Sequence, residues 1–141
     1  MNERSAFRFA ITLPVRFGDL DVLGHVNNAT YLTYFEEARI AYWRNLFTLD
    51  GEKMESLGII LADANVNFRS PAKLGELLKV SVRVAAFGTK SFRMEYKIEN
   101  ASTQRLIADG STAVVMFDYR TGTSIPVPDE VKKTILAFES P

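Results

Sequence analysis

The residues best suited to chemistry lie together in one short segment, between a predicted strand and a predicted helix. Segment 17–28 contains two carboxylates, Asp19 and Asp21, the only histidine of the chain, His25, and two asparagines, Asn27 and Asn28. A carboxylate beside a reactive group can act as a nucleophile or as a general base toward water. Aspartate and asparagine are also common turn and cap residues, so from residue type alone a structural loop remains an alternative.

A long helix is predicted directly after this segment. Residues 29–49 contain no glycine or proline. Side chains spaced three or four apart form two stripes, which together make the helix apolar around much of its girth: Leu32, Phe35, Arg39, Tyr42 and Leu46, and Tyr31, Tyr34, Ala38 and Ala41. Such a helix belongs inside a domain, with Asn27 or Asn28 as its N-cap and Asp50-Gly51 as its stop. Its first N–H groups lack internal partners and carry the positive end of the helix dipole, so they favour a carboxylate or a developing oxyanion.

Five strands are predicted from alternating apolar and polar residues, at about 7–15, 60–68, 78–86, 92–99 and 105–117. Gly110, within the fifth, indicates a bulge or a close approach of another group. A short helix at 129–138 follows the Pro126-Val127-Pro128 breaker, with Val131, Ile135 and Phe138 as its docking face. These elements predict one α+β domain over 1–141, in which a five-stranded antiparallel sheet wraps around the long helix.

The composition excludes several classes of protein. Of the 141 residues 47% are hydrophobic and 24% are charged, which is typical of a globular chain. Lysine plus arginine equals aspartate plus glutamate at 17 each, so the basic excess of a nucleic-acid binder is missing. The absence of cysteine excludes disulfides, thiol nucleophiles and zinc–thiolate sites. No signal peptide or membrane span is visible in the sequence, and we therefore expect a cytoplasmic location.

The run from Val15 to Arg39, which includes Gly18-Asp19-Leu20-Asp21 and Gly24-His25-Val26-Asn27-Asn28, resembles the signature of the 4-hydroxybenzoyl-CoA thioesterase family of hotdog proteins. Phe68-Arg69-Ser70-Pro71 with Leu74-Gly75-Glu76, and Gly88-Thr89-Lys90-Ser91, are similar to two further parts of that family. The resemblance implies a hotdog fold and acyl-CoA thioesterase activity. It also implies a homodimer or homotetramer with active sites at subunit interfaces. It implies no metal and no cofactor other than the coenzyme A of the substrate.

The resemblance also implies roles for individual residues. It assigns Asp21 as the catalytic carboxylate and the backbone N–H of Asn28 as the donor that polarises the thioester carbonyl. Gly24 matches the glycine that turns the chain between them, and Asp19 falls at a position that holds the loop. His25 matches the branch of the family that acts on short-chain and fatty acyl-CoA, which favours an aliphatic acyl group.

For the rest of the substrate, the resemblance suggests Arg69, Lys90 and Ser91 as partners of the coenzyme A phosphates. Tyr31, Tyr34 and Phe35 could line the acyl tail, although core packing explains them equally well. Other hotdog enzymes place a glutamate of the active site on the central helix, where Glu36 and Glu37 are available. These two are interpreted instead as structural partners of Arg39 or of a facing subunit.

Two other functions remain open from the sequence. An enoyl-thioester hydratase or dehydratase of the same fold would use an aspartate–histidine dyad, for which Asp21 and His25 are available. A non-catalytic acyl-thioester binding module would need neither residue for chemistry. The spacing from Asp21 to Asn28 and Tyr31 fits the thioesterase branch better.

Overall fold

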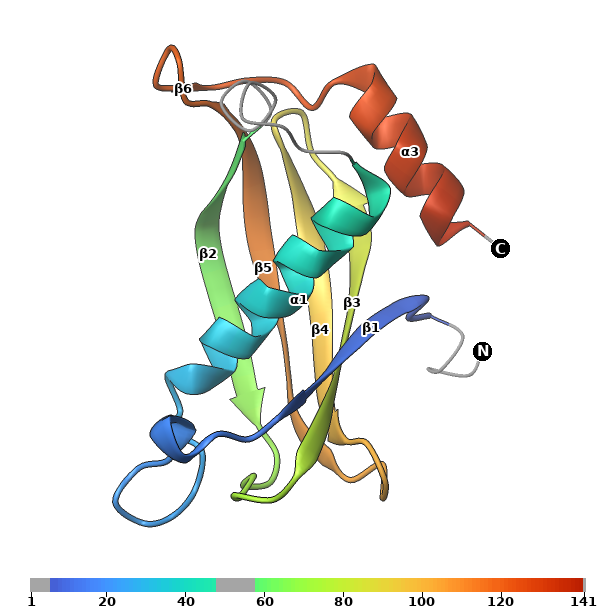
Figure 1. The fold of residues 1–141 in the computed structure, drawn as a ribbon. Coiled ribbons are helices and arrows are strands. Elements are labelled where there is room, and N and C mark those ends of the chain that lie inside the picture. Colours follow the sequence, from blue (N-terminus) through green and yellow to red (C-terminus); the bar gives the residue numbers. More distant parts are fainter. Residues whose placement is uncertain (1–5, 48–57, 141) are drawn as a thin grey trace.

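Five long strands form one antiparallel sheet in the computed structural model, which describes residues 6–47 and 58–140. They are β1 (Phe9–Pro14), β2 (Gly58–Phe68), β3 (Leu77–Phe87), β4 (Ser91–Asn100) and β5 (Leu106–Asp118). Their order in the sheet is β1-β3-β4-β5-β2 (Figure 1). The predicted five strands are thereby confirmed. A sixth strand, β6 (Thr123–Ser124), pairs with β5 and was not predicted, because two residues are too short to show alternation.

Helix α1 (Thr30–Leu46) lies diagonally across one face of this sheet, and a 3-10 turn, η2 (Phe17–Asp19), precedes it (Figure 1). The helix ends earlier than predicted. Phe47 is already extended, with φ −131° and ψ 136°, and its ring packs against Trp43 with ring centroids 4.5 Å apart. The predicted stop at Asp50-Gly51 lies outside the described residues. Of the helices that the structure describes, none is long and apolar enough to cross a membrane.

The start of α1 also differs from the prediction. Its N-cap is Ala29, and no side chain caps the helix. Asn27 instead bends the chain just before the helix: its Oδ1 accepts a hydrogen bond from the Ala29 N–H (3.0 Å), and its carbonyl oxygen accepts one from the Thr30 N–H (2.9 Å). The prediction of Asn27 or Asn28 as the N-cap was therefore wrong, because Asn27 makes a turn that ends where the helix begins.

The core lies between α1 and the central strands. The rings of Phe35 and Tyr96 stack at 4.3 Å, and those of Trp43 and Phe92 at 6.1 Å, which joins both halves of α1 to β4. A Cβ at position 110 would collide with the carbonyl oxygen of Asn65 and lie 2.9 Å from Cε2 of Phe35. Gly110 therefore marks a close approach of chain and ring, which is one of its two predicted meanings.

Strand β2 is less buried than its apolar residues predicted. It is an edge strand whose register shifts between Leu61 and Asp63. Ile60 remains 37% exposed and Phe68 53% exposed, while Val66 packs against the core. Because β2 lies at the sheet border, alternation alone cannot show how much of it the helix covers.

Helix α3 (Asp129–Glu139) packs beside the C-terminal half of α1 (Figure 1). Val131 and Ile135 are buried and Phe138 packs partly against the core, so the predicted docking face is confirmed. The hydroxyl of Tyr42 donates to Oε2 of Glu139 at 2.6 Å, and this oxygen also accepts the Val84 N–H at 2.9 Å. These bonds fix the C-terminal half of α1. Its N-terminal end lies beside segment 17–28 and the loop after β2.

Candidate active site

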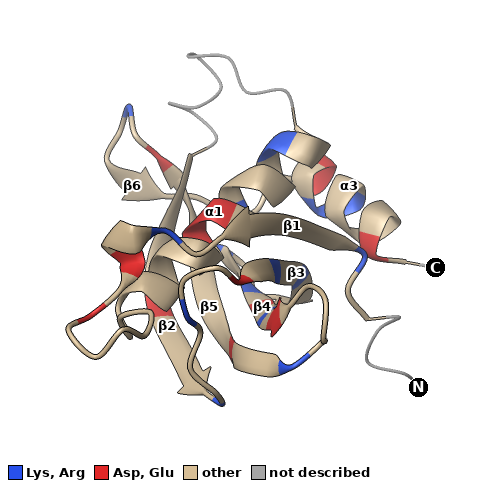
Figure 2. Ribbon diagram, turned by 60° about the horizontal axis from the view of Figure 1, so that its bottom comes forward, with Lys and Arg blue, Asp and Glu red and all other residues tan. Residues whose placement is uncertain are grey.

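A pocket of about 270 Å³ opens at the N-terminal end of α1. Two loops and the first turn of the helix form it, and its lining residues are Asp21, His25, Val26, Asn28, Tyr31, Phe68, Arg69, Ser70 and Pro71. Five residues predicted for the site, at positions 21, 25, 28, 31 and 69, thus lie in one pocket. Acidic and basic positions are interspersed over this end of the molecule (Figure 2).

Segment 20–26 folds back on itself as a small turn. The N–H of Asp21 donates to the carbonyl oxygen of His25 (2.8 Å), and the N–H of Gly24 donates to the carbonyl oxygen of Asp21 (3.1 Å). Gly24 has a φ of +82°, the left-handed region in which glycine carries no steric cost. The N–H of Val26 donates to the carbonyl oxygen of Ala72 (2.9 Å), which ties the turn to the loop after β2.

Asp21 is half-buried, and the described residues bond to only one of its carboxylate oxygens. Its Oδ1 accepts hydrogen bonds from the N–H groups of Leu23 (2.9 Å) and His25 (3.3 Å). For Oδ2, the described residues provide no hydrogen-bond donor. The carboxylate is therefore fixed through one oxygen while the other is available to a bound molecule.

Asp19 lies two residues earlier, and its hydrogen bonds hold the loop. Its Oδ2 accepts the N–H of Arg16 (2.9 Å) and the hydroxyl proton of Tyr34 (2.7 Å). Its carbonyl oxygen accepts the N–H of Asn27 (2.8 Å). Burial first, and then the bond to Asp19 and its charge, raise the pKa of Tyr34. From the sequence Tyr34 was named only as a residue that could line the acyl tail. Its bond to Asp19 was not predicted, because on the helix Tyr34 is one more member of the apolar stripe.

The backbone N–H of Asn28 lies at the start of α1, just before the N-cap Ala29. Asn27 accepts the next two N–H groups, those of Ala29 and Thr30. Within residues 6–47 and 58–140, no acceptor is found for the N–H of Asn28. This residue is exposed and lines the pocket. An unpaired N–H at the positive end of a helix dipole is suited to bind an anionic oxygen.

Tyr31 and His25 form the wall next to Asp21. Tyr31 is 3% exposed, its hydroxyl oxygen accepts the N–H of Ala72 at 3.4 Å, and its ring packs edge-on against Tyr34. Burial raises the pKa of Tyr31; the bond from Ala72 opposes this, and the charges of Glu76 and Asp21 contribute to the increase. The backbone of His25 pairs with Lys73, and its imidazole has no hydrogen-bond partner in the part of the chain that the structure describes.

Glu76 fixes the loop that forms the opposite wall, although in the sequence it stands out only as part of a motif. Its carboxylate accepts hydrogen bonds from the Lys73 N–H (2.7 Å), from Nδ2 of Asn100 (2.8 Å) and from Nη2 of Arg105 (2.7 Å). Burial alone would raise the pKa of Glu76, but these hydrogen bonds and the charge of Arg105 outweigh it, so the pKa is lowered. An acidic residue beside a glycine gave no signal that its own loop and the turn between β4 and β5 are joined through its side chain.

The three residues suggested for the coenzyme A phosphates are not brought together within one chain. Arg69 lines the pocket, but its guanidinium forms a bidentate pair with Asp109, with Nε and Nη2 each 3.2 Å from a carboxylate oxygen. Lys90 and Ser91 lie in the β3–β4 hairpin, beyond Phe92 and Trp43, at the C-terminal end of α1 (Figure 1).

Both glutamates of the helix pair with an arginine. The partner of Glu36 is Arg39, as interpreted from the sequence, whereas the partner of Glu37 is Arg16, which was not predicted. Glu36 lies 3.8 Å from Arg39, and Glu37 lies 3.6 Å from Arg16.

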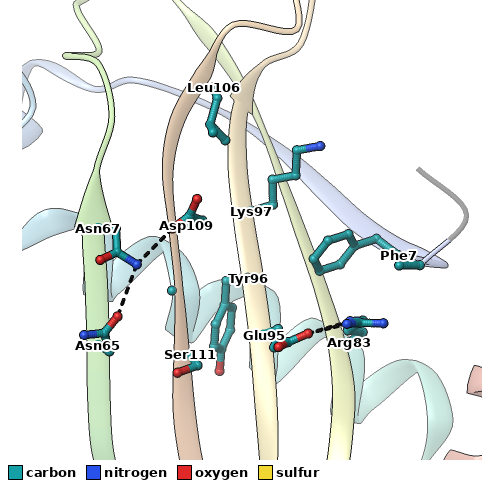
Figure 3. A pocket seen from close by; sticks show the side chains of 12 residues that line it. Phe7, Asn65, Asn67, Arg83, Glu95, Tyr96, Lys97, Leu106, Asp109 and Ser111 are labelled. Atoms are coloured by element: carbon teal, nitrogen blue, oxygen red, sulfur yellow. Dashed lines mark hydrogen bonds and ion pairs between the residues drawn. The ribbon is translucent and has the colours of Figure 1, made fainter. Parts of the chain in front are cut away.

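A larger hollow, of about 400 Å³, lies on the sheet face opposite α1 (Figure 3). Its polar groups bond to one another: Arg83 to Glu95, and Nδ2 of Asn67 to both Asn65 and Asp109. The carboxylates of this hollow, those of Glu95 and Asp109, already have donors, so the pocket at α1 is the better candidate for chemistry. Among residues 6–47 and 58–140 there is no group of three or more His, Cys, Asp or Glu side chains that could hold a metal ion.

Comparison with known proteins identifies the family of this chain. Residues 15–135 match the family model described as the Thioesterase-like superfamily. The long-chain acyl-CoA thioesterase FadM of Escherichia coli (strain K12) is 28% identical over 123 residues, which cover 87% of this chain and 93% of FadM. The 1,4-dihydroxy-2-naphthoyl-CoA hydrolase of Synechococcus elongatus is 24% identical, covering 84% of this chain and 88% of the hydrolase.

A crystal structure of a thioesterase from Thermus thermophilus, complexed with coenzyme A and Zn, has a TM-score of 0.85 and 32% identity. The match covers 96% of this chain and 97% of the Thermus chain. The chain therefore belongs to the Thioesterase-like superfamily and is a thioester hydrolase of the hotdog fold.

Proposed function

We propose that this chain hydrolyses acyl-CoA thioesters, with Asp21 as the reacting carboxylate and the N–H of Asn28 as an oxyanion donor. One observation carries the proposal. Asp21 and Asn28 line the same pocket at the positive end of α1, and among the described residues neither Oδ2 of Asp21 nor the N–H of Asn28 has a hydrogen-bond partner. A carboxylate beside an N–H donor is the arrangement that addition to a thioester carbonyl requires.

Two routes are open to Asp21. As a general base it takes a proton from water while the water oxygen bonds to the carbonyl carbon, and the carbonyl π pair moves onto the oxygen held by Asn28. The C=O bond then re-forms, the C–S bond breaks with its electron pair on sulfur, and sulfur takes the proton from Asp21. As a nucleophile Asp21 bonds to the carbonyl carbon and expels the thiolate, and water then hydrolyses the mixed anhydride. Neither route needs a metal or a redox cofactor.

The substrate class rests on the relatives. FadM is named for long-chain acyl-CoA and the Thermus structure contains coenzyme A. Tyr31 and Phe68, whose ring centroids are 5.7 Å apart, give the pocket an apolar wall for an acyl group. Together with His25, this favours an aliphatic acyl chain. A location in the cytoplasm stays a prediction.

A second copy of the chain completes the site in this proposal. A pocket of about 270 Å³ is smaller than most small-molecule sites, which range from about 300 to 1,000 Å³. Phe68, at one side of the pocket, is exposed at the end of the edge strand β2. Pairing of two β2 edges would cover this side and would allow Lys90 and Ser91 of a second copy to reach the coenzyme.

The test is an acyl-CoA panel of increasing chain length, assayed in parallel for thiol release and for hydration of enoyl-CoA. We expect thiol release with an optimum among aliphatic chains, and its loss in Asp21→Ala. Hydration without thiol release would instead support the hydratase. The geometry speaks against that dyad, because Asp21 bonds to the backbone N–H of His25 and not to its imidazole. Tight acyl-CoA binding with no turnover in the wild type would support a binding module.

A further inference from the structure

Tyr31 has a hydroxyl group whose proton is not used by the described part of the protein. The residue is only 3% exposed and lines the pocket, and its oxygen accepts the N–H of Ala72 at 3.4 Å. Residues 6–47 and 58–140 offer no acceptor for its proton. Tyr34, one turn later on the same helix, is also buried, but its proton is bound by Asp19 at 2.7 Å. A buried donor without an acceptor is uncommon in folded proteins and calls for an explanation.

Tyr31 and Asn28 line the same pocket at the start of α1. Tyr31 is in the first turn of the helix, and Asn28 lies just before the N-cap Ala29, with no acceptor for its N–H among the described residues. Long side chains in a helix lean toward its N-terminus, which directs the ring of Tyr31 back toward the first turn. The contact with Ala72 fixes the ring against the opposite loop.

We propose that the Tyr31 hydroxyl is a second hydrogen-bond donor to the thioester carbonyl oxygen, and that it forms an oxyanion hole with the N–H of Asn28. This inference rests on the proposed function and extends it to a catalytic residue. When an oxygen nucleophile adds to the carbonyl carbon, the π pair moves onto the carbonyl oxygen, and both donors bind the resulting negative charge. Tyr31 keeps its proton throughout, because burial raises its pKa.

The first experiment compares Tyr31→Phe with the wild type by steady-state kinetics. The phenyl ring preserves the packing against Tyr34 and Phe68, while the donor is lost. Removal of one oxyanion donor typically lowers kcat about a hundredfold or more. We expect a fall of about this size with KM changed less than about twofold, since the donor acts on charge that develops during the reaction. Tyr119→Phe is the matched control, because its hydroxyl donates to the Ile59 carbonyl far from the pocket.

A second measurement separates catalysis from a structural role, because Tyr31→Phe also removes the acceptor of the Ala72 N–H. Two non-hydrolysable acyl-CoA analogues are compared: a thioether, which resembles the ground state without the carbonyl, and a hydrated trifluoromethyl ketone, which resembles the tetrahedral intermediate. We expect Tyr31→Phe to weaken binding of the ketone by about the same factor by which it lowers kcat. Binding of the thioether is expected to stay unchanged.

Three results would overturn the inference. They are activity of Tyr31→Phe within twofold of the wild type, equal weakening of both analogues, and unchanged affinity for the ketone. A wild-type protein that does not hydrolyse any acyl-CoA would instead contradict the proposed function itself. The two failures are therefore distinguishable in the same set of assays.

Discussion

Asp19 and Asp21 are two residues apart, yet their surroundings differ in a way that separates support from chemistry. The carboxylate of Asp19 accepts from a backbone N–H and from the hydroxyl of Tyr34, and the same residue accepts the N–H of Asn27 through its carbonyl oxygen. The carboxylate of Asp21 also accepts two hydrogen bonds on one oxygen, but both come from backbone N–H groups of its own turn, and Asp21 lines the pocket at α1. The comparison teaches that the identity of the residue says less about its role than which groups it bonds to and whether it borders the pocket.

Tyr31 and Tyr34, which follow one another by one turn of α1, also differ in their hydrogen bonds. Tyr34 donates its proton to Asp19, and Tyr31 has a proton with no acceptor among the residues described. One pair, Asp19 and Tyr34, therefore fixes the loop to α1, and we call it the anchoring pair. The other pair, Asp21 and Tyr31, lines the pocket, and among the described residues neither Oδ2 of Asp21 nor the hydroxyl proton of Tyr31 has a partner. Substitutions in the two pairs, and in the residues that support them, test whether the pairs have separate roles.

The largest effect is expected for Asp21→Asn. Loss of a general base typically lowers the rate about 10² to 10⁴-fold, whereas the amide oxygen can still accept the N–H groups of Leu23 and His25. We therefore expect hydrolysis to fall by at least about a hundredfold with little change in the melting temperature. Asp129→Asn, at the exposed start of α3, is the control with the same chemical change and should keep wild-type activity. A substantial loss of stability in Asp21→Asn would show that this carboxylate, too, supports the fold.

The anchoring pair should show the opposite pattern. Asp19→Ala leaves the buried hydroxyl of Tyr34 without an acceptor, which costs about 1–3 kcal/mol. Tyr34→Phe instead removes the hydroxyl itself, so no buried donor is left unpaired, and it costs about 1 kcal/mol. Urea unfolding measures both. We expect Asp19→Ala to be the less stable of the two, with activity reduced but not abolished. Equal stability of Asp19→Ala and the wild type would be incompatible with an anchoring role.

The stabilisation that Glu76 gives to the wall of the pocket is expected to depend on pH. Its pKa is lowered in the folded protein from an ordinary value of 4.5. The stabilisation it provides is therefore complete well above pH 4.5 and is lost as the pH falls through the lowered, folded-state pKa. We expect Glu76→Gln to be less stable than the wild type at about pH 7, with the difference shrinking on acidification. A difference in unfolding free energy that stays constant from about pH 7 to about pH 3 would refute this.

The smallest effect is expected for Gly24→Ala. The backbone at Gly24 has a φ of +82°, and no atom lies within 4 Å of an added Cβ, so the cost is conformational, about 1 kcal/mol. Gly122→Ala is a matched control, with φ +69° and equally open space in a remote turn. We expect equal losses of stability, but a loss of activity only at position 24, where the turn sets the N–H groups around Asp21. Equal activities of the two variants would show that the turn does not position the carboxylate.

Much of the fold was predictable because alternation and helical spacing were strong in the central elements. The residues of β4 alternate cleanly, and α1 is apolar on two stripes, so both were found with small errors at their ends. The order of the strands and the exposure of β2 were not predictable, because pairing depends on contacts distant in sequence. The N-cap was misplaced because Asn27 suits both a cap and the turn that it forms.

The candidate site, too, was predictable only in part. Asp21, His25, Asn28 and Tyr31 were proposed from one contiguous motif, and the structure places them in one pocket. Tyr34 and Glu76 support that pocket through side-chain hydrogen bonds across 15 and up to 29 residues, for which a single sequence contains no signal. Lys90 and Ser91 lie at the other end of α1, so a role in substrate binding requires a second copy of the chain.

Chemical rescue tests most directly which of the two carboxylates, Asp19 or Asp21, takes part in the reaction. Formate is added to Asp21→Ala and to Asp19→Ala, and the rate of thiol release from one acyl-CoA is followed as the formate concentration rises. If Asp21 supplies the reacting carboxylate, formate should raise the rate of Asp21→Ala in a saturable manner and leave Asp19→Ala unchanged. Rescue of Asp19→Ala with none for Asp21→Ala would contradict the assignment, because the reacting carboxylate would then be Asp19.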